Sequence, residues 1–189
     1  MRRFGATSIN TNTQETSTLG NDRFYLYMLV IEAARNERFM FGNGAQWYIV
    51  TDAGDKVVID TDQCRIESVP NYQGDPSFAW DTVRTITAFL MQTCGAVHET
   101  TMPYNVARKK AAEYLRNGHL VHTNGAQWHF YVHGTVYCFD FSGSAEPGRV
   151  ANVSQYDAHA SWRYMECMGG NTYRAKATES MKKFFGIFS

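Results

Sequence analysis

Imidazole, thiol and carboxylate side chains gather on one predicted sheet face in the second half of the chain. Residues 119–122, 128–133 and 136–140 read as three strands of a meander, and alternation along them places six side chains on that face: His122, Gln127, His129, Tyr131, Cys138 and Asp140. We expect His129 opposite Cys138 across the strands, with His122 and Asp140 a diagonal step away. These four are types of ligand that bind zinc-like ions. Histidines on a half-exposed sheet face also serve as solvated or packing residues, so the six are predicted as a binding face with no metal or cofactor assigned.

The other face of the same predicted sheet is apolar and is expected to form the core. Its members are Val121, Trp128, Phe130, Val132, Tyr137 and Phe139. In the first half of the chain, the positions equivalent to the histidine-bearing face are largely apolar: Phe41, Gln46, Tyr48, Val50, Val58 and Asp60. Imidazoles and a thiol in only one half are typical of a duplicated scaffold in which one copy has diverged toward a site.

The equivalence rests on a repeated word, Asn-Gly-Ala-Gln-Trp, at residues 43–47 and again at 124–128. Matches continue on both sides of it and include Glu32, Arg35, Asn36, Asp60 and Trp80 against Glu113, Arg116, Asn117, Asp140 and Trp162. A module of about 80 residues is therefore predicted to occur twice. The predicted pairing places Gln46 opposite Asp60, and Gln127 opposite Asp140, as amide-to-carboxylate hydrogen bonds across strands.

Each copy is predicted to run α-β-β-β-β-α. Residues 106–116 are rich in strong helix formers, which assigns the apolar run at 24–36 to a helix as well. Asn-Gly between apolar runs predicts a hairpin, and Asp75-Pro76 or Asp157 is expected to open the second helix. The predicted fold class is α+β, with antiparallel meander sheets, helices on one face and a pseudo-two-fold axis.

Four segments follow from this reading. Residues 1–20 are a flexible polar arm, 21–96 and 97–172 are the two repeat lobes of one pseudo-symmetric domain, and 173–189 form a C-terminal amphipathic helix. We expect this last helix to pack back on the body; a tip that binds a partner or a membrane is the alternative.

Composition narrows the classes of partner. Eighteen basic residues balance eighteen acidic ones, which removes a bulk charge argument for nucleic acid or anionic membrane. The four cysteines lack any Cys-x-x-Cys pair, and there is neither an apolar leader nor a run of transmembrane length. We expect a protein of the cytoplasm, that of the host if the source is a virus, with no membrane contact.

Two resemblances supply alternatives. His98-Glu99-Thr100 and His159-Ala160-Ser161 have the His-x-Thr/Ser form of the two-histidine phosphoesterases, which implies proton exchange with a cyclic phosphate. In that family the motifs occupy equivalent strands, whereas here His159 aligns with Ser77. Two successive four-strand-plus-helix units resemble PUR-type and Whirly-type single-stranded nucleic-acid binders. That likeness implies that bases stack on Tyr48 and Tyr131 and that phosphates meet basic side chains, namely Arg2, Arg3, Arg108, Lys109, Lys110, Lys182 and Lys183.

No nucleophile elbow, phosphate-binding glycine loop or His-Glu-x-x-His helix occurs, so no catalytic residue is assigned. The prediction is a small non-enzymatic interaction protein, virus- or mobile-element-encoded, that binds a host or assembly protein. A single-stranded nucleic-acid binder is the first alternative, and a metal-dependent or two-histidine phosphoesterase the second. The sequence leaves the oligomeric state open.

Overall fold

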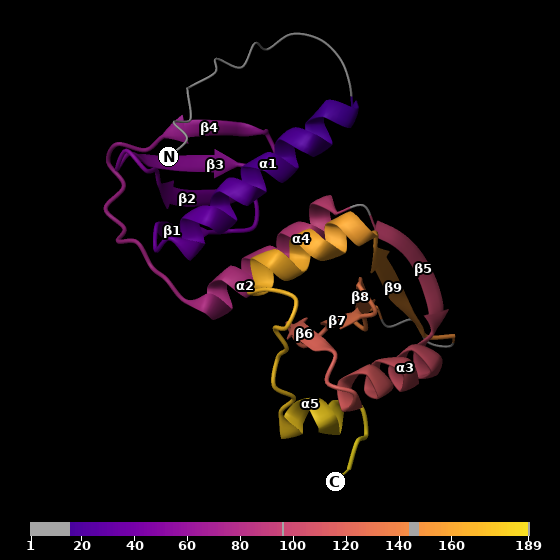
Figure 1. The fold of residues 1–189 in the computed structure, drawn as a ribbon. Coiled ribbons are helices and arrows are strands. Elements are labelled where there is room, and N and C mark those ends of the chain that lie inside the picture. The colour runs from indigo at the N-terminus through magenta and orange to yellow at the C-terminus, as the bar shows by residue number, and fades with distance from the viewer. Residues whose placement is uncertain (1–15, 96, 144–147, 189) are drawn as a thin grey trace.

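A computed structural model describes residues 16–95, 97–143 and 148–188, with only the backbone described at 16–21 (Figure 1). The first half contains α1 (Thr16–Arg35), β1 (Phe39–Gly42), β2 (Gln46–Val50), β3 (Lys56–Asp60), β4 (Arg65–Ser68) and α2 (Trp80–Cys94). The second half contains β5 (Val97–Pro103), α3 (Tyr104–Arg116), β6 (Leu120–Thr123), β7 (Gln127–Val132), β8 (Thr135–Asp140), β9 (Val150–Tyr156), α4 (Ala158–Met168) and α5 (Glu179–Phe184).

The strands form two antiparallel sheets, so the predicted α+β class is confirmed. Sheet A has the meander order β1-β2-β3-β4, and sheet B has the order β5-β9-β8-β7-β6. The edge strand β5 was not predicted. Most of its side chains are exposed, so its sequence lacks an apolar alternation, and its pairing with β9 along its whole length holds it in place.

The two Asn-Gly hairpins share one geometry. Asn43 Oδ1 accepts from the backbone N–H groups of residues 45 and 46 at 3.1 and 2.8 Å, and Asn124 Oδ1 accepts from those of 126 and 127 at the same two distances. Gly44 and Gly125 follow with φ of 94° and 96°, a left-handed conformation that favours glycine. The first strand of each hairpin also carries a bulge, which lies between Phe39 and Phe41 in β1 and between Leu120 and His122 in β6.

Helices cover the two sheets differently, which corrects the prediction of helices on one face. On sheet A, the helix α1 packs over the face that carries Trp47, Ile49 and Ile59. On sheet B, both faces are covered: α3 and α5 lie over the face of Trp128 and Phe130, while α2 and α4 lie over the opposite face. Sheet B is therefore the middle layer of three (Figure 1).

Helix α2 joins the two halves. Val83, Ile86 and Leu90 belong to the core beneath α1, whereas Ala88 and Met91 belong to the core shared by α4 and sheet B. The predicted lobe 21–96 thus contains a helix that serves both sheets, because a helix with apolar residues around most of its girth can be buried on two sides.

Two predicted helix starts differ in outcome. Asp157 caps α4, and its side chain accepts from Ala160 N at 2.7 Å, as expected. The predicted start at Asp75 is wrong, since α2 begins at Trp80 without a side-chain cap. The predicted arm at 1–20 falls mostly outside the described residues, and its last part, from Thr16, is the first turn of α1.

The C-terminal segment packs back on the body, as expected. Helix α5 is only six residues long, and Phe185 is buried against sheet B. Phe184 stacks on Trp128 with ring centroids 5.3 Å apart, and Phe185 meets the same ring edge-on at 4.8 Å. Phe188 beyond the helix is exposed.

Candidate functional site

The structure places the six predicted site residues on neighbouring strands of sheet B. In the register, His129 lies opposite Cys138 and Gln127 opposite Asp140, as the sequence predicts. His122 lies directly opposite His129 and not a diagonal step away, because the hairpin first pairs Thr123 with Trp128, two residues further along β7 than a two-residue Asn-Gly turn would give. A bulge follows on β6, between Leu120 and His122. The same bulge places Val121 in the core beneath α2 and α4, so its predicted position on the face of Trp128 is wrong.

The histidine-bearing face is covered and not open. Helices α2 and α4 bury His129 to 1% exposure and Cys138 to 4%. The Gln92 side-chain nitrogen on α2 lies 2.9 Å from His129 Nε2 and donates to Cys138 Sγ at 3.2 Å. In this arrangement Nε2 accepts from the amide nitrogen, and Nδ1 is buried with no hydrogen-bond partner among the described residues. The Tyr164 ring of α4 stacks on His129, with centroids 5.4 Å apart.

Burial sets the protonation states of this cluster. Desolvation lowers the pKa of His129 to about 3, and the neighbouring His122 adds to the lowering. Burial also lowers the pKa of His122 and raises the pKa of the Cys138 thiol to about 12. At neutral pH the cluster therefore holds neutral imidazoles and a protonated thiol, which is a poor nucleophile. Its contacts are those of a buried polar core.

The four metal candidates do not converge. Asp140 accepts from Gln127 Nε2 at 3.0 Å and from the backbone N–H of Ser142 at 2.8 Å, so its hydrogen bonds go to Gln127 and to the turn after β8. Among the described residues, no three His, Cys, Asp or Glu side chains are grouped as ligands for a metal ion. Tyr131 lies beneath the guanidinium of Arg174, 5.1 Å from its ring centroid.

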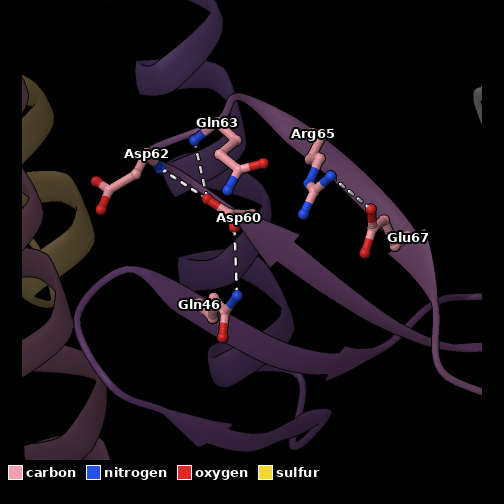
Figure 2. Close-up of polar contacts among 6 residues, drawn as sticks. All are labelled: Gln46, Asp60, Asp62, Gln63, Arg65 and Glu67. Atoms are coloured by element: carbon pink, nitrogen blue, oxygen red, sulfur yellow. Dashed lines mark hydrogen bonds and ion pairs between the residues drawn. The ribbon is translucent and has the colours of Figure 1, made fainter.

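Sheet A repeats the amide-to-carboxylate pair (Figure 2). Gln46 Nε2 donates to Asp60 Oδ2 at 3.3 Å, and the backbone N–H groups of Asp62 and Gln63 donate to Asp60 Oδ1 at 3.1 and 2.9 Å. These bonds, the one from Gln63 most of all, hold the pKa of the buried Asp60 below its usual value. These hydrogen bonds to Asp60 therefore stabilise the turn after β3, so the Gln46–Asp60 pair has a structural role.

The phosphoesterase motifs are not brought together. His98 is exposed on the edge strand β5, and His159 is exposed on α4, where it stacks on Trp162. Ser161 is buried and donates to the carbonyl of Tyr156 while accepting from the backbone N–H of Val136. A hydroxyl engaged in this way cannot hold a substrate phosphate beside His159.

The residues predicted to bind nucleic acid are partly occupied by the chain itself. Tyr48 stacks on Tyr72 with centroids 4.8 Å apart, which covers one side of its ring. Arg2 and Arg3 lie outside the described residues. Lys182 pairs with Glu179 at 2.7 Å, whereas Arg108 and Lys109 share one face of α3 and line a pocket.

Two cavities that sequence reasoning missed lie away from the histidines. The first, here called the Trp47 groove, measures about 560 Å³ between the β1-β2 hairpin and α2, and its lining includes Phe41, Trp47, Asp81, Thr85, Ile86 and Phe89. The second, here called the Arg108 pocket, measures about 350 Å³ beside α3, and its lining includes Tyr104, Arg108, Lys109, Ala112, Arg116 and Phe185. The only sequence signal for the second was the basic run on a predicted helix; for the first there was none, because α2 arrives from a distant part of the chain.

Comparison of the chain with protein-family models, with curated proteins and with solved structures found no match. Each helix in the described part of the chain is too short or too polar to cross a bilayer.

Proposed function

We propose that the protein is a small non-enzymatic binding protein, built from a duplicated module, that acts in the cytoplasm on a host or assembly protein. The matching hairpins, with the same turn bonds, glycine angles and bulges at equivalent positions, support the duplication. The buried state of the histidine cluster favours a binding role over chemistry, since a reacting group must reach its substrate. Thiols at Cys94, Cys138 and Cys167 are in keeping with a reducing compartment.

The Trp47 groove is the surface that we assign to the partner. Phe41 is 49% exposed and Phe89 is 40% exposed, and both line the one groove. Single exposed apolar residues are ordinary on protein surfaces, but neighbouring aromatic rings around a groove are typical of an interaction site.

The second copy indicates what the occupant resembles. Its tryptophan, Trp128, is covered by Phe184 and Phe185 of the chain's own α5. Trp47 occupies the matching place in the first hairpin, with Phe89 of α2 6.0 Å from its ring and the groove left beside it. Trp47 itself is only 5% exposed, so the rings that the groove leaves open are those of Phe41 and Phe89. This difference is the observation that carries the proposal: an aromatic-bearing segment of the partner lies against Phe41 and Phe89, beside the hairpin whose counterpart packs against α5.

Site-specific photocrosslinking in extract of the native source tests the proposal. A photoreactive side chain at Thr85, which is exposed and lines the groove, is expected to capture one partner through a segment that contains an aromatic residue. The same group at Thr101, exposed on β5, is the matched control and should capture nothing in common. Phe41→Asp should abolish the capture, and Phe188→Asp should leave it unchanged. Equal capture from both positions, or capture that persists in Phe41→Asp, would overturn the proposal.

A further inference from the structure

The Arg108 pocket is built by one stripe of α3 and by the turn that follows α5. Asn105, Arg108, Lys109, Ala112 and Arg116 recur at the spacing of a single helix face. The opposite wall is Phe185 and Gly186, which come from the far end of the chain (Figure 1). Ala112 is 4% exposed and is the smallest side chain on the stripe, which leaves room between the longer ones.

The charge of this pocket departs from that of the chain. Arg108, Lys109 and Arg116 line it, and no acidic residue does, although acidic and basic residues are equal in number overall. The acidic residue on α3, Glu113, is not part of the lining. Three cations around a cavity of about 350 Å³ concentrate positive potential where a small anion would be held.

Arg108 is held in place but is incompletely paired. Its Nη2 donates to the carbonyl of Phe184, and its guanidinium carbon lies 5.9 Å from the centroid of the Phe184 ring. Its Nε is buried and has no hydrogen-bond partner among the described residues. A buried donor without an acceptor is costly, and an oxygen of a ligand in the pocket would satisfy it. The Phe184 carbonyl thus holds the guanidinium beside the pocket and leaves its Nε available to a ligand oxygen.

The first copy shows that the stripe need not be basic. Counted from the two Asn-Gly turns, Arg108 and Lys109 correspond to Tyr27 and Met28 of α1. Tyr27 is 3% exposed in the core, and Met28 packs against it. Arg116 keeps the basic character of its counterpart Arg35, so the difference between the copies lies at the other two positions. There, core residues of α1 are replaced by the cations Arg108 and Lys109 in the copy where the short α5 lies beside the helix.

We propose that the Arg108 pocket binds the terminal phosphate of a phosphorylated ligand. The guanidinium of Arg108 offers planar donors that match phosphate oxygens, and Lys109 and Arg116 supply further charge-assisted hydrogen bonds. The phosphate comes either from a free small molecule or from the 5′ end of an oligonucleotide, and both present the same dianionic group. This inference is independent of the Trp47 groove and stands whether or not that groove binds a protein.

Calorimetry with pyrophosphate at low salt is the direct test, using the full chain. Lys109→Gln and Arg116→Gln should each weaken pyrophosphate binding about tenfold, the loss expected for one charge-assisted contact. Arg108→Gln should abolish binding, but it also frees the Phe184 carbonyl, so the other two variants carry the test. The matched control is Lys110→Gln, which removes the same charge from the adjacent position, where the ammonium lies 5.9 Å from the Tyr114 ring centroid, and which should change binding less than twofold.

A second arm distinguishes the two sources of the phosphate. Binding of a 5′-phosphorylated oligonucleotide that pyrophosphate competes away, with no binding of the unphosphorylated oligonucleotide, assigns the nucleic-acid end; pyrophosphate binding alone assigns a small molecule. The proposal is overturned if pyrophosphate does not bind at low salt, or if Lys110→Gln weakens binding as much as Lys109→Gln, since that result describes diffuse charge attraction without a pocket.

Discussion

Acidification should destabilise the protein through His129 in a pH window where the carboxylates do not yet titrate. Its pKa is about 3 in the folded chain, against an ordinary value of 6.5, because the ring is buried. Between pH 6.5 and 3, His129 therefore binds a proton in the unfolded chain but not in the folded chain. Stability associated with this group is present above pH 6.5 and is lost as the pH falls toward 3.

The expected loss follows from this difference in pKa. Each pH unit between 6.5 and 3 corresponds to about 1.4 kcal/mol, so acidification from pH 7.5 to 5.0 should lower the free energy of unfolding by about 2 kcal/mol. For a chain of 189 residues this corresponds to a fall of roughly 4 to 8 °C in Tm. The pKa of His122 is also lowered by burial, so its contribution has the same sign.

Urea unfolding of the wild type and of His129→Phe at both pH values is the assay. The variant leaves Gln92 without its acceptor at either pH, so it is expected to be less stable throughout, but its loss between pH 7.5 and 5.0 should be smaller than that of the wild type by about 2 kcal/mol. His98→Phe, at an exposed position on β5, is the matched control and should keep the pH dependence of the wild type. If His129→Phe and the wild type lose equal stability on acidification, His129 is protonated in the folded state and the covered face is wrong.

Three further outcomes are expected. Gly44→Ala and Gly125→Ala place a side chain at φ of 94° and 96°, so each should lower the free energy of unfolding by about 1 to 2 kcal/mol and by similar amounts in urea; unequal losses would show that the two turns differ. Phe185→Ala should lower the free energy of unfolding by about 3 to 4 kcal/mol because the ring is buried on sheet B. Phe188→Ala, at an exposed position, should change it by less than about 0.5 kcal/mol, and scanning calorimetry of both variants makes the comparison. The pKa of Asp60 is lowered in the folded chain, so the stability that it contributes is present above pH 4 and is lost as the pH falls further. Asp60→Asn should therefore make the free energy of unfolding depend less on pH below pH 4. A dependence equal to that of the wild type would count against the hydrogen bonds of the turn.

Local pattern predicted the hairpins, and the register of the β2-β3 and β7-β8 pairs. Gln46 with Asp60 and Gln127 with Asp140 pair as expected, whereas the strands joined by the second Asn-Gly turn pair two residues away from the expected register. The bulge at Leu120 was not readable, because an extra residue in an edge strand leaves the apolar pattern nearly intact, and it moved Val121 to the other face.

What covers a sheet face was harder to predict than which residues share it. His129 and Cys138 read as a half-exposed polar face because histidine is common on surfaces. Their burial depends on Gln92 and Tyr164, which come from helices distant in the chain. Alternation within a strand carries no information about such long-range contacts, so the face was predicted but its partner was not.

Helix α2 has a consequence for communication between the two sheets. Thr85, in the wall of the Trp47 groove, and Gln92, bonded to His129, are two turns apart on the same side of one rod, a rise of about 10 Å. We expect a helix to move along its axis largely as one body. A ligand in the groove that displaces Thr85 would then also displace the Gln92 side chain and change its hydrogen bond to the buried ring of His129.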